Sequence, residues 1–144
     1  MHINQIATRI TNRSDHRPGE VDISHPYRRR WWLPVIGPTA TVLVDHLATV
    51  GTGDWQIHDT TELATALGLG RGTGLHSPLI RTLERLTRFG FGTFDIAPGH
   101  PHSDPCLSVW RTIGLVPERV TQGWPQAMQQ AHAIDLVALH RAAA

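Results

Sequence analysis

Three arginines, Arg81, Arg85 and Arg88, recur at the spacing of one face of an α-helix. A guanidinium group donates paired hydrogen bonds to phosphate oxygens and to the edge of guanine, so a row of arginines suits nucleic-acid binding. Glu84 lies among them and is spaced to pair with Arg81 or Arg88 along a helix. Ordinary solvent-exposed helices also show this pattern. It therefore indicates a class of function, nucleic-acid binding, and no particular target.

The segment that carries these arginines, residues 77–90, has a marked beginning and end. Ser77 is a favoured N-cap residue, Pro78 suits the first helical position, and Gly90 favours a stop. Four apolar residues share the face opposite the arginines: Leu79, Ile80, Leu83 and Leu86. The sequence therefore predicts a helix over residues 77–90 that buries one face and shows arginines on the other.

Further elements are predicted on both sides of this helix. The predicted helices cover residues 37–49, 59–67 and 124–141, and the predicted strands cover residues 55–58, 92–96 and 106–113. Asp59 and Glu62 have the spacing of a capping box. The last two strands flank a polar loop, which predicts a hairpin. The final helix carries more apolar surface than one contact needs, which favours a homodimer or a protein partner.

The N-terminal residues 1–30 contain six arginines and three acidic residues. They show little periodicity apart from a short strand or helix around residues 3–10, so we expect a flexible or partner-ordered arm. The arm ends in the sequence YRRRWW at residues 27–32. Either its Trp rings pack on the domain while its arginines stay in water, or the arginines contact phosphates or the minor groove. These arginines are Arg28, Arg29 and Arg30.

Composition places further bounds on the chain. Its 144 residues fit one domain of ordinary size, and its net charge is only +1. All 13 basic residues are Arg, and residues 71–88 hold four of them against one acid, an uneven charge that is a weak sign of nucleic-acid binding. The lone Cys106 excludes an internal disulfide and fits a reducing compartment. No apolar run is long enough to span a membrane and no signal-peptide core is present, so we expect a cytoplasmic protein.

The predicted order of elements resembles the winged helix-turn-helix domains of bacterial transcription regulators. The matching segments are residues 59–64 with 67–68 for the support helix, residues 77–91 for the recognition helix and residues 91–113 for the wing. The resemblance covers roughly residues 34–115 and rests on pattern. It implies an α+β fold with a three-helix core and a β-hairpin wing. On this reading residues 1–30 are a basic arm, residues 31–115 the winged-helix domain and residues 116–144 an extra C-terminal helix.

The resemblance implies that the third helix docks in the major groove of double-stranded DNA and that the wing touches the backbone or minor groove. Carried onto this chain, the base readers are Ser77, Arg81, Arg85 and Arg88, and the phosphate contacts are Arg71 and Thr73. Two features depart from the family: the turn between the two helices has about nine residues, where tight units use 3–4, and the wing tip lacks Arg and Lys.

The sequence therefore favours a small DNA-binding transcription regulator. A protein–protein interaction module with little DNA contact is the alternative.

Signatures of catalysis are missing from the sequence. It has no nucleophile elbow, no zinc-protease His pair and no phosphate-binding loop with Lys, so we expect neither an enzyme nor a cofactor. The polar loop of the hairpin has potential metal ligands at alternate positions: His100, His102, Asp104 and Cys106. A polar turn in a chain rich in His is the preferred interpretation, so no metal site is predicted. Other histidines, including His46 and His132, show no partner spacing.

Overall fold

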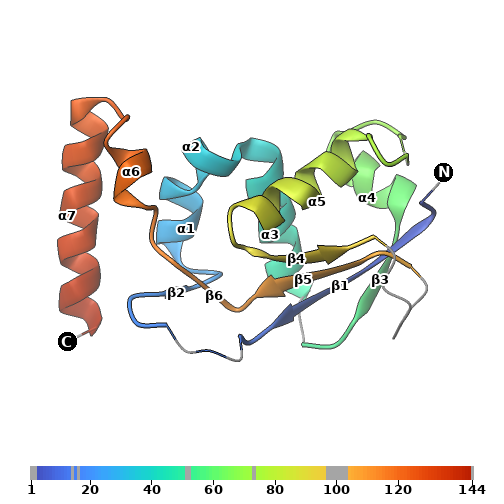
Figure 1. The fold of residues 1–144 in the computed structure, drawn as a ribbon, viewed down its shortest axis with the longest axis horizontal. Helices are drawn as coiled ribbons and strands as arrows, with labels where there is room; N and C mark the ends of the chain where they lie inside the picture. Colours follow the sequence, from blue (N-terminus) through green and yellow to red (C-terminus); the bar gives the residue numbers. More distant parts are fainter. Residues whose placement is uncertain are drawn as a thin grey trace.

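The computed structural model describes residues 3–13, 15, 17–50, 53–72, 74–96 and 104–143. Its main sheet has four strands in the order β3-β1-β5-β4 (Figure 1). These strands are β1 (Gln5–Thr11), β3 (Gln56–Asp59), β4 (Gly92–Asp95) and β5 (Cys106–Trp110). A second, two-stranded sheet joins β2 (Val21–Asp22) to β6 (Thr112–Ile113). The mixed α+β character that the sequence predicts is confirmed.

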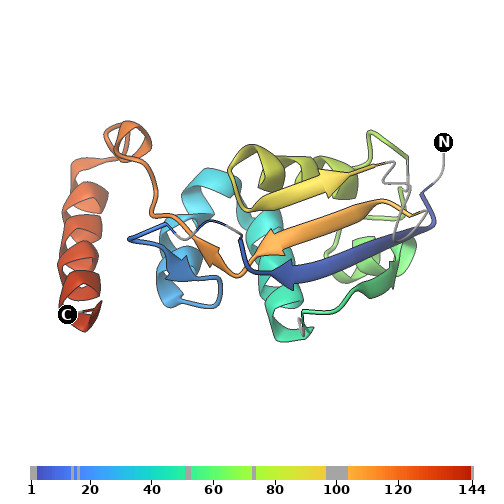
Figure 2. The same cartoon turned by 60° about the horizontal axis from the view of Figure 1, so that its bottom comes forward.

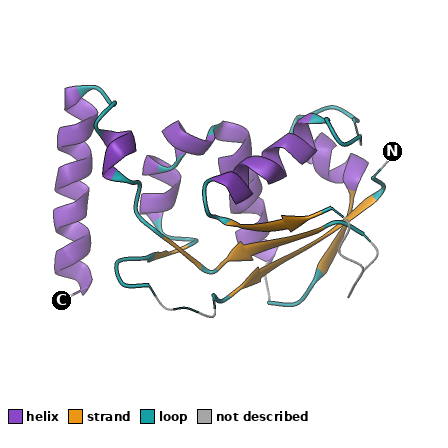
Figure 3. Cartoon of the chain, in the orientation of Figure 1, coloured by secondary structure: helices purple, strands orange, loops and turns teal. Residues whose placement is uncertain are grey.

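The described helices gather on one side of the main sheet, and none of them crosses its other face (Figure 2). They are α1 (Pro26–Trp31), α2 (Leu33–Ile36), α3 (Pro38–Val50), α4 (Thr60–Ala66), α5 (Pro78–Arg88), α6 (Glu118–Thr121) and α7 (Gln126–Ala143). The helix α7 stands at one end of the molecule beside α1, apart from the main sheet (Figure 3). Within the described ranges, no helix combines the length and the apolar character needed to cross a membrane.

The strand β1 lies inside the sheet, antiparallel to β3 and parallel to β5. Its residues Ile6, Thr8 and Ile10 lie on one face and are buried, and Ala7 on the opposite face is buried as well. The short strand or helix expected around residues 3–10 is therefore a strand, and residues 5–11 belong to the main sheet. The local pattern could not show that the partners of this strand lie far along the chain.

The predicted hairpin is present, because β4 and β5 pair antiparallel with Gly92 opposite Val109. At Gly92 a Cβ atom would overlap the carbonyl oxygen of Ser108, so only glycine allows the strands to approach this closely. The second predicted strand, residues 106–113, is interrupted at Arg111. Residues 112–113 turn away to pair with β2 as β6.

The helices α3, α4 and α5 begin and end within two residues of the predicted positions. Asp59 caps α4 by accepting the backbone N–H of Glu62 at 2.9 Å, and Ser77 caps α5 by accepting that of Ile80 at 3.4 Å. Gly90 follows α5 with φ of 82°, the left-handed conformation that glycine adopts without strain. These contacts form between residues close in sequence, which explains why a local pattern reveals them.

Candidate nucleic-acid interface

The helix α5 turns one face to the core and one face to solvent. Its four apolar residues, Leu79, Ile80, Leu83 and Leu86, are fully buried, as their spacing predicts. The hydroxyl of Thr82 donates to the carbonyl of Pro78 at 2.7 Å, which satisfies the remaining buried polar group on this side. The core therefore fixes the rotation of α5 and decides which residues it displays.

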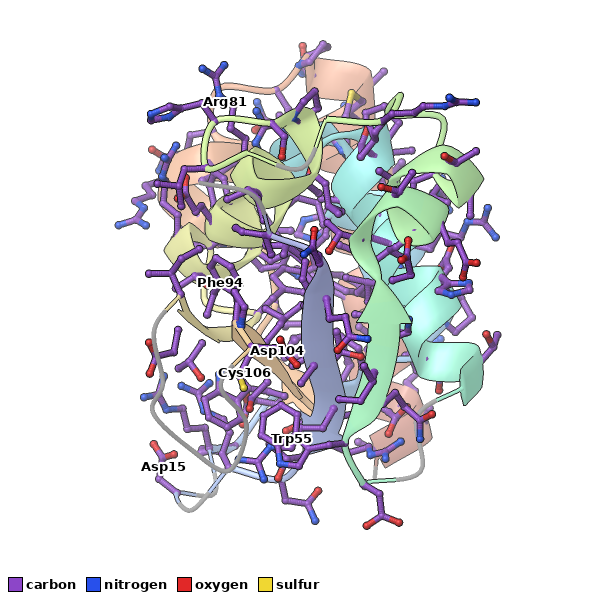
Figure 4. All side chains as sticks on the ribbon, turned by 90° about the vertical axis from the view of Figure 1, so that its right-hand side faces the viewer. Asp15, Trp55, Arg81, Phe94, Asp104 and Cys106 are labelled. Atoms are coloured by element: carbon purple, nitrogen blue, oxygen red, sulfur yellow. The ribbon has the colours of Figure 1, made fainter. Side chains whose placement is uncertain are left out.

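Arg81 and Arg88 are exposed on the outward face. Arg81 projects from α5 away from the sheet (Figure 4). Within the described part of the chain, neither guanidinium forms an ion pair. Glu84 is exposed between them and forms no ion pair either, so the pairing suggested by its spacing is not present. Both arginines keep their full hydrogen-bonding capacity for a ligand.

Arg85 shares this face, but its side chain is tied back to the protein. Its Nη1 donates to the carbonyl oxygen of Ile36 at 3.3 Å, where α2 ends. The residue stays exposed and a guanidinium has five N–H donors, so most of them remain available. Its position is more restricted than that of Arg81 or Arg88.

The remaining predicted residues near α5 differ in their accessibility. Ser77 is buried and its hydroxyl is used as the N-cap, so its side chain is not displayed on the outward face of α5. Arg71 is exposed beside a groove of about 470 Å³ that α4 also lines, with no ion pair among the described residues. Thr73 lies outside the described residues.

The arginines of α1 occupy different environments from those of α5. Arg28 is only 3 % exposed, and its Nη2 lies 2.6 Å from the Asp45 carboxylate while its Nε donates to the carbonyl of Ile23. The guanidinium of Arg28 is therefore not displayed to a ligand, unlike the arginines of α5. Arg29 and Arg30 are exposed, but each meets a carboxylate, Arg29 that of Asp45 at 3.4 Å and Arg30 that of Asp135 at 3.0 Å.

The described arginines thus differ in whether an acidic side chain pairs with them. All ion pairs between described residues use arginines between positions 13 and 30, where each guanidinium meets an Asp or Glu. The arginines of α5, together with Arg71, have no such partner. An excess of positive charge therefore remains at α5, although the net charge of the whole chain is only +1.

Sequence reasoning missed a buried polar cluster between α1 and α7. His132 is the buried residue of α7, and its Nε2 lies 2.7 Å from the hydroxyl of Tyr27. Its ring contacts Trp31 and Trp124 edge-on, at centroid distances of 5.0 and 5.5 Å, and the two Trp rings stack on each other. Burial lowers the pKa of His132. The only sequence signal was a His within the predicted final helix.

A second missed pair consists of His46 on α3 and His58 on β3, whose ring centroids are 6.3 Å apart. Burial, and to a smaller extent the neighbouring His46, lowers the pKa of His58.

In the hairpin, Cys106 is buried and its thiol donates to the carbonyl of Asp104. Burial raises the pKa of this thiol. His100 and His102 lie outside the described residues.

Comparison with known proteins gives little further information. No protein-family model matches the sequence, and no curated protein matches it either. Among solved structures, the chain is similar to the primosome protein DnaB (residues 1–300) from Geobacillus stearothermophilus, with a TM-score of 0.49 and 13 % sequence identity. The match covers 96 % of this chain and 50 % of that chain. A likeness at this level carries no argument about function.

Proposed function

We propose that the chain is a DNA-binding protein, a small transcription regulator with a winged-helix domain that places α5 in the major groove of double-stranded DNA. The order α3, β3, α4, α5, β4, β5 supports the winged-helix reading, because it follows the resemblance described above. One departure is that β1 lies between β3 and β5, so those two strands do not pair directly. We propose a binding protein and no catalytic activity.

The observation that carries this proposal is the unpaired positive charge of α5. Guanidinium groups without an acidic partner bind phosphate or guanine without first breaking an ion pair, whereas Arg29 and Arg30 would have to give up a carboxylate. Arg81 and Arg88 are seven residues apart, a rise of roughly 10 Å along a helix. That distance corresponds to about three base pairs of B-DNA, so both reach one stretch of groove.

The hairpin contributes less to phosphate binding than α5 does. The strand β4 ends at Asp95 and β5 begins at Cys106, and the residues between them include Asp104 and neither Arg nor Lys. Acidic and neutral groups release no counterions from DNA, so affinity would rest on α5 and Arg71. We therefore expect modest affinity and a shallow dependence on salt.

Fluorescence anisotropy with random-sequence duplex DNA at several salt concentrations tests the proposal. The double variant Arg81→Ala/Arg88→Ala should weaken binding and lower the salt slope by roughly one to two units. The matched control, Arg119→Ala/Arg141→Ala, removes the same charge from exposed positions of α6 and α7 and should bind like the wild type. Equal weakening in both variants, or no binding even at low salt, would overturn the proposal. Deleting residues 1–30 is unsuitable, because it removes β1.

A protein–protein interaction module is the second candidate, and α7 favours it. Ile134 is 69 % exposed and Val137 is 51 % exposed on the outer side of this helix. Together with Ala127 and Ala138 they form an apolar strip that the rest of the described chain leaves uncovered. A homodimer or a protein partner would bind there. Light scattering of the wild type and of Ile134→Gln distinguishes a dimer, whose mass should fall in the variant, from a monomer.

A further inference from the structure

The short helix α6 lies beside the N-terminal end of α7 (Figure 1), and a groove runs between the two helices. The groove has a volume of about 300 Å³, which is at the lower end of the range for sites that bind small molecules. Its described lining joins apolar to polar side chains: Val116, Ala133, Leu136, Glu118, Thr121, Gln129 and His132. The proposed function uses none of these polar groups.

The ring of His132 has one nitrogen without a partner in the protein. The residue is only 6 % exposed and its Nε2 is held by the Tyr27 hydroxyl, but no described residue forms a hydrogen bond with Nδ1. Within the described part of the chain, Oγ1 of Thr60 is the one fully shielded side-chain polar atom that lacks a partner. Nδ1 of His132 therefore reaches solvent, and it does so at the groove that this residue lines. Polar atoms of buried residues usually have a partner, so a ligand with a matching group fits this position.

The hydrogen bond with Tyr27 decides what Nδ1 offers to a ligand. The Tyr27 oxygen accepts the backbone N–H of Val116 at 3.0 Å, so the Tyr27 hydroxyl can donate its own hydrogen to Nε2 of His132. A neutral imidazole has one N–H, which then lies on Nδ1. Burial lowers the pKa of His132 and so favours the neutral ring. Nδ1–H is therefore a hydrogen-bond donor at the wall of the groove.

The other polar groups of the groove are hydrogen-bond acceptors. The Thr121 hydroxyl donates its hydrogen to the backbone carbonyl of Glu118 at 3.1 Å, which leaves the hydroxyl oxygen as an acceptor. The side-chain nitrogen of Gln129 donates to the carbonyls of Gln122 and Trp124 at 3.3 and 2.8 Å, so Oε1 of Gln129 remains available. The Glu118 carboxylate is exposed and forms no ion pair with a described residue. The groove thus combines oxygen acceptors, one of them charged, with an imidazole donor.

We propose that this groove binds a small aliphatic primary amine that also carries an oxygen acceptor. A protonated amine has three N–H donors and one positive charge, which match the oxygen acceptors of the groove and the charge of Glu118. The ligand oxygen accepts Nδ1–H of His132, and the hydrocarbon part of the ligand packs on Val116 and Leu136. The proposal does not depend on DNA binding, because none of these residues belongs to α5.

Titration of the full chain with L-leucinamide, followed by the NMR signals of the His132 ring and the Ala133 methyl group, tests the proposal. This probe joins a carbonyl oxygen and a branched hydrocarbon to an amine that is largely protonated at about pH 7. We expect both signals to shift in a saturable way. N-acetyl-L-leucinamide lacks the charge and should bind at least about tenfold more weakly, whereas isopentylamine lacks the oxygen and should bind about two- to tenfold more weakly.

Variants of exposed residues assign the binding to this groove. Glu118→Gln removes the charge and should weaken leucinamide binding at least about tenfold, and Thr121→Val removes one acceptor and should weaken it about two- to tenfold. The matched control Glu62→Gln changes an exposed glutamate of α4 and should bind like the wild type. Equal affinity for the acetylated probe, unchanged affinity in Glu118→Gln, or the absence of a saturable shift at His132 would overturn the proposal.

Discussion

The hydroxyl of Tyr27 lies 2.7 Å from Nε2 of His132, and the same oxygen accepts the backbone N–H of Val116 at 3.0 Å. Because Tyr27 already accepts a hydrogen bond from Val116, its own hydrogen is available for Nε2, and this arrangement suits a neutral imidazole. Trp31 adds a hydrogen bond to the carboxylate of Asp135, one turn beyond His132. These contacts attach α7 to α1, so the attachment should be sensitive to the charge of His132.

Acidification should weaken the fold through His132. Burial lowers its pKa below the ordinary value of 6.5, and Asp135 opposes this shift only in part. Between the lowered pKa and 6.5 the unfolded chain binds more protons, so the free energy of unfolding rises with pH and levels off above about 6.5. Urea unfolding followed by Trp fluorescence between about pH 5 and 8 measures this dependence.

The variant His132→Gln isolates the contribution of this residue. Glutamine can still accept from Tyr27 but does not titrate, so the variant should lose less stability than the wild type as the pH falls. His58, whose pKa is also lowered, contributes equally to both proteins and cancels in the difference. Parallel pH curves for the two proteins would contradict a titrating His132.

Arg28 and Arg29 should differ sharply in their effect on stability, although they are neighbours. Removing the buried Arg28 guanidinium leaves the Ile23 carbonyl without its donor and leaves Asp45 with only the exposed Arg29, so Arg28→Ala should cost about 3 kcal/mol. The Arg29 side chain is 70 % exposed, and Arg29→Ala should cost less than about 1 kcal/mol. Urea midpoints measure both values, and similar losses would contradict a structural role for Arg28.

The features that could be predicted from sequence are those set by residues close together in the chain. The caps at Asp59 and Ser77 satisfy backbone N–H groups three residues away, and the buried face of α5 follows from helical spacing alone. Capping residues and the spacing of apolar residues largely determine where a helix begins and which face it buries, and both can be read from a short segment.

The features that could not be predicted depend on partners far apart in sequence. Nothing near Arg28 shows that its guanidinium meets Asp45, and nothing near Tyr27 points to His132. In α7 the apolar residue Ile134 is exposed while His132 is buried, because the aromatic rings of α1 and Trp124 provide the packing surface. Contacts between residues far apart in sequence therefore decide which side chains, such as those of Arg28 and His132, are buried.

A hydroxyl at the start of α4 should be dispensable for stability. Thr60 is fully buried, and its Oγ1 has no hydrogen-bond partner among the described residues. Burying an unpaired hydroxyl costs about 1–3 kcal/mol, so Thr60→Val should be neutral or stabilise the fold by about 1 kcal/mol. The control Thr41→Val removes a similarly buried hydroxyl that donates to the carbonyl of Gly37 at 2.9 Å and should destabilise by about 1 kcal/mol. Thermal unfolding compares the two variants, and a loss of stability in Thr60→Val would indicate a partner for its hydroxyl.

The close approach of β4 to β5 should make Gly92 intolerant of any side chain. A Cβ atom at Gly92 would overlap the Ser108 carbonyl oxygen and crowd the backbone of Val109, neither of which can rotate away. Gly92→Ala should therefore cost at least about 2–3 kcal/mol, the upper part of the range for overpacking, because the two strands must separate. Gly114→Ala is the matched control: nothing lies within 4 Å of the added Cβ, so we expect a small change. Urea midpoints together with amide hydrogen exchange of β4 and β5 would show whether the loss arises in the hairpin, and a Gly92→Ala protein as stable as Gly114→Ala would contradict the close pairing of these strands.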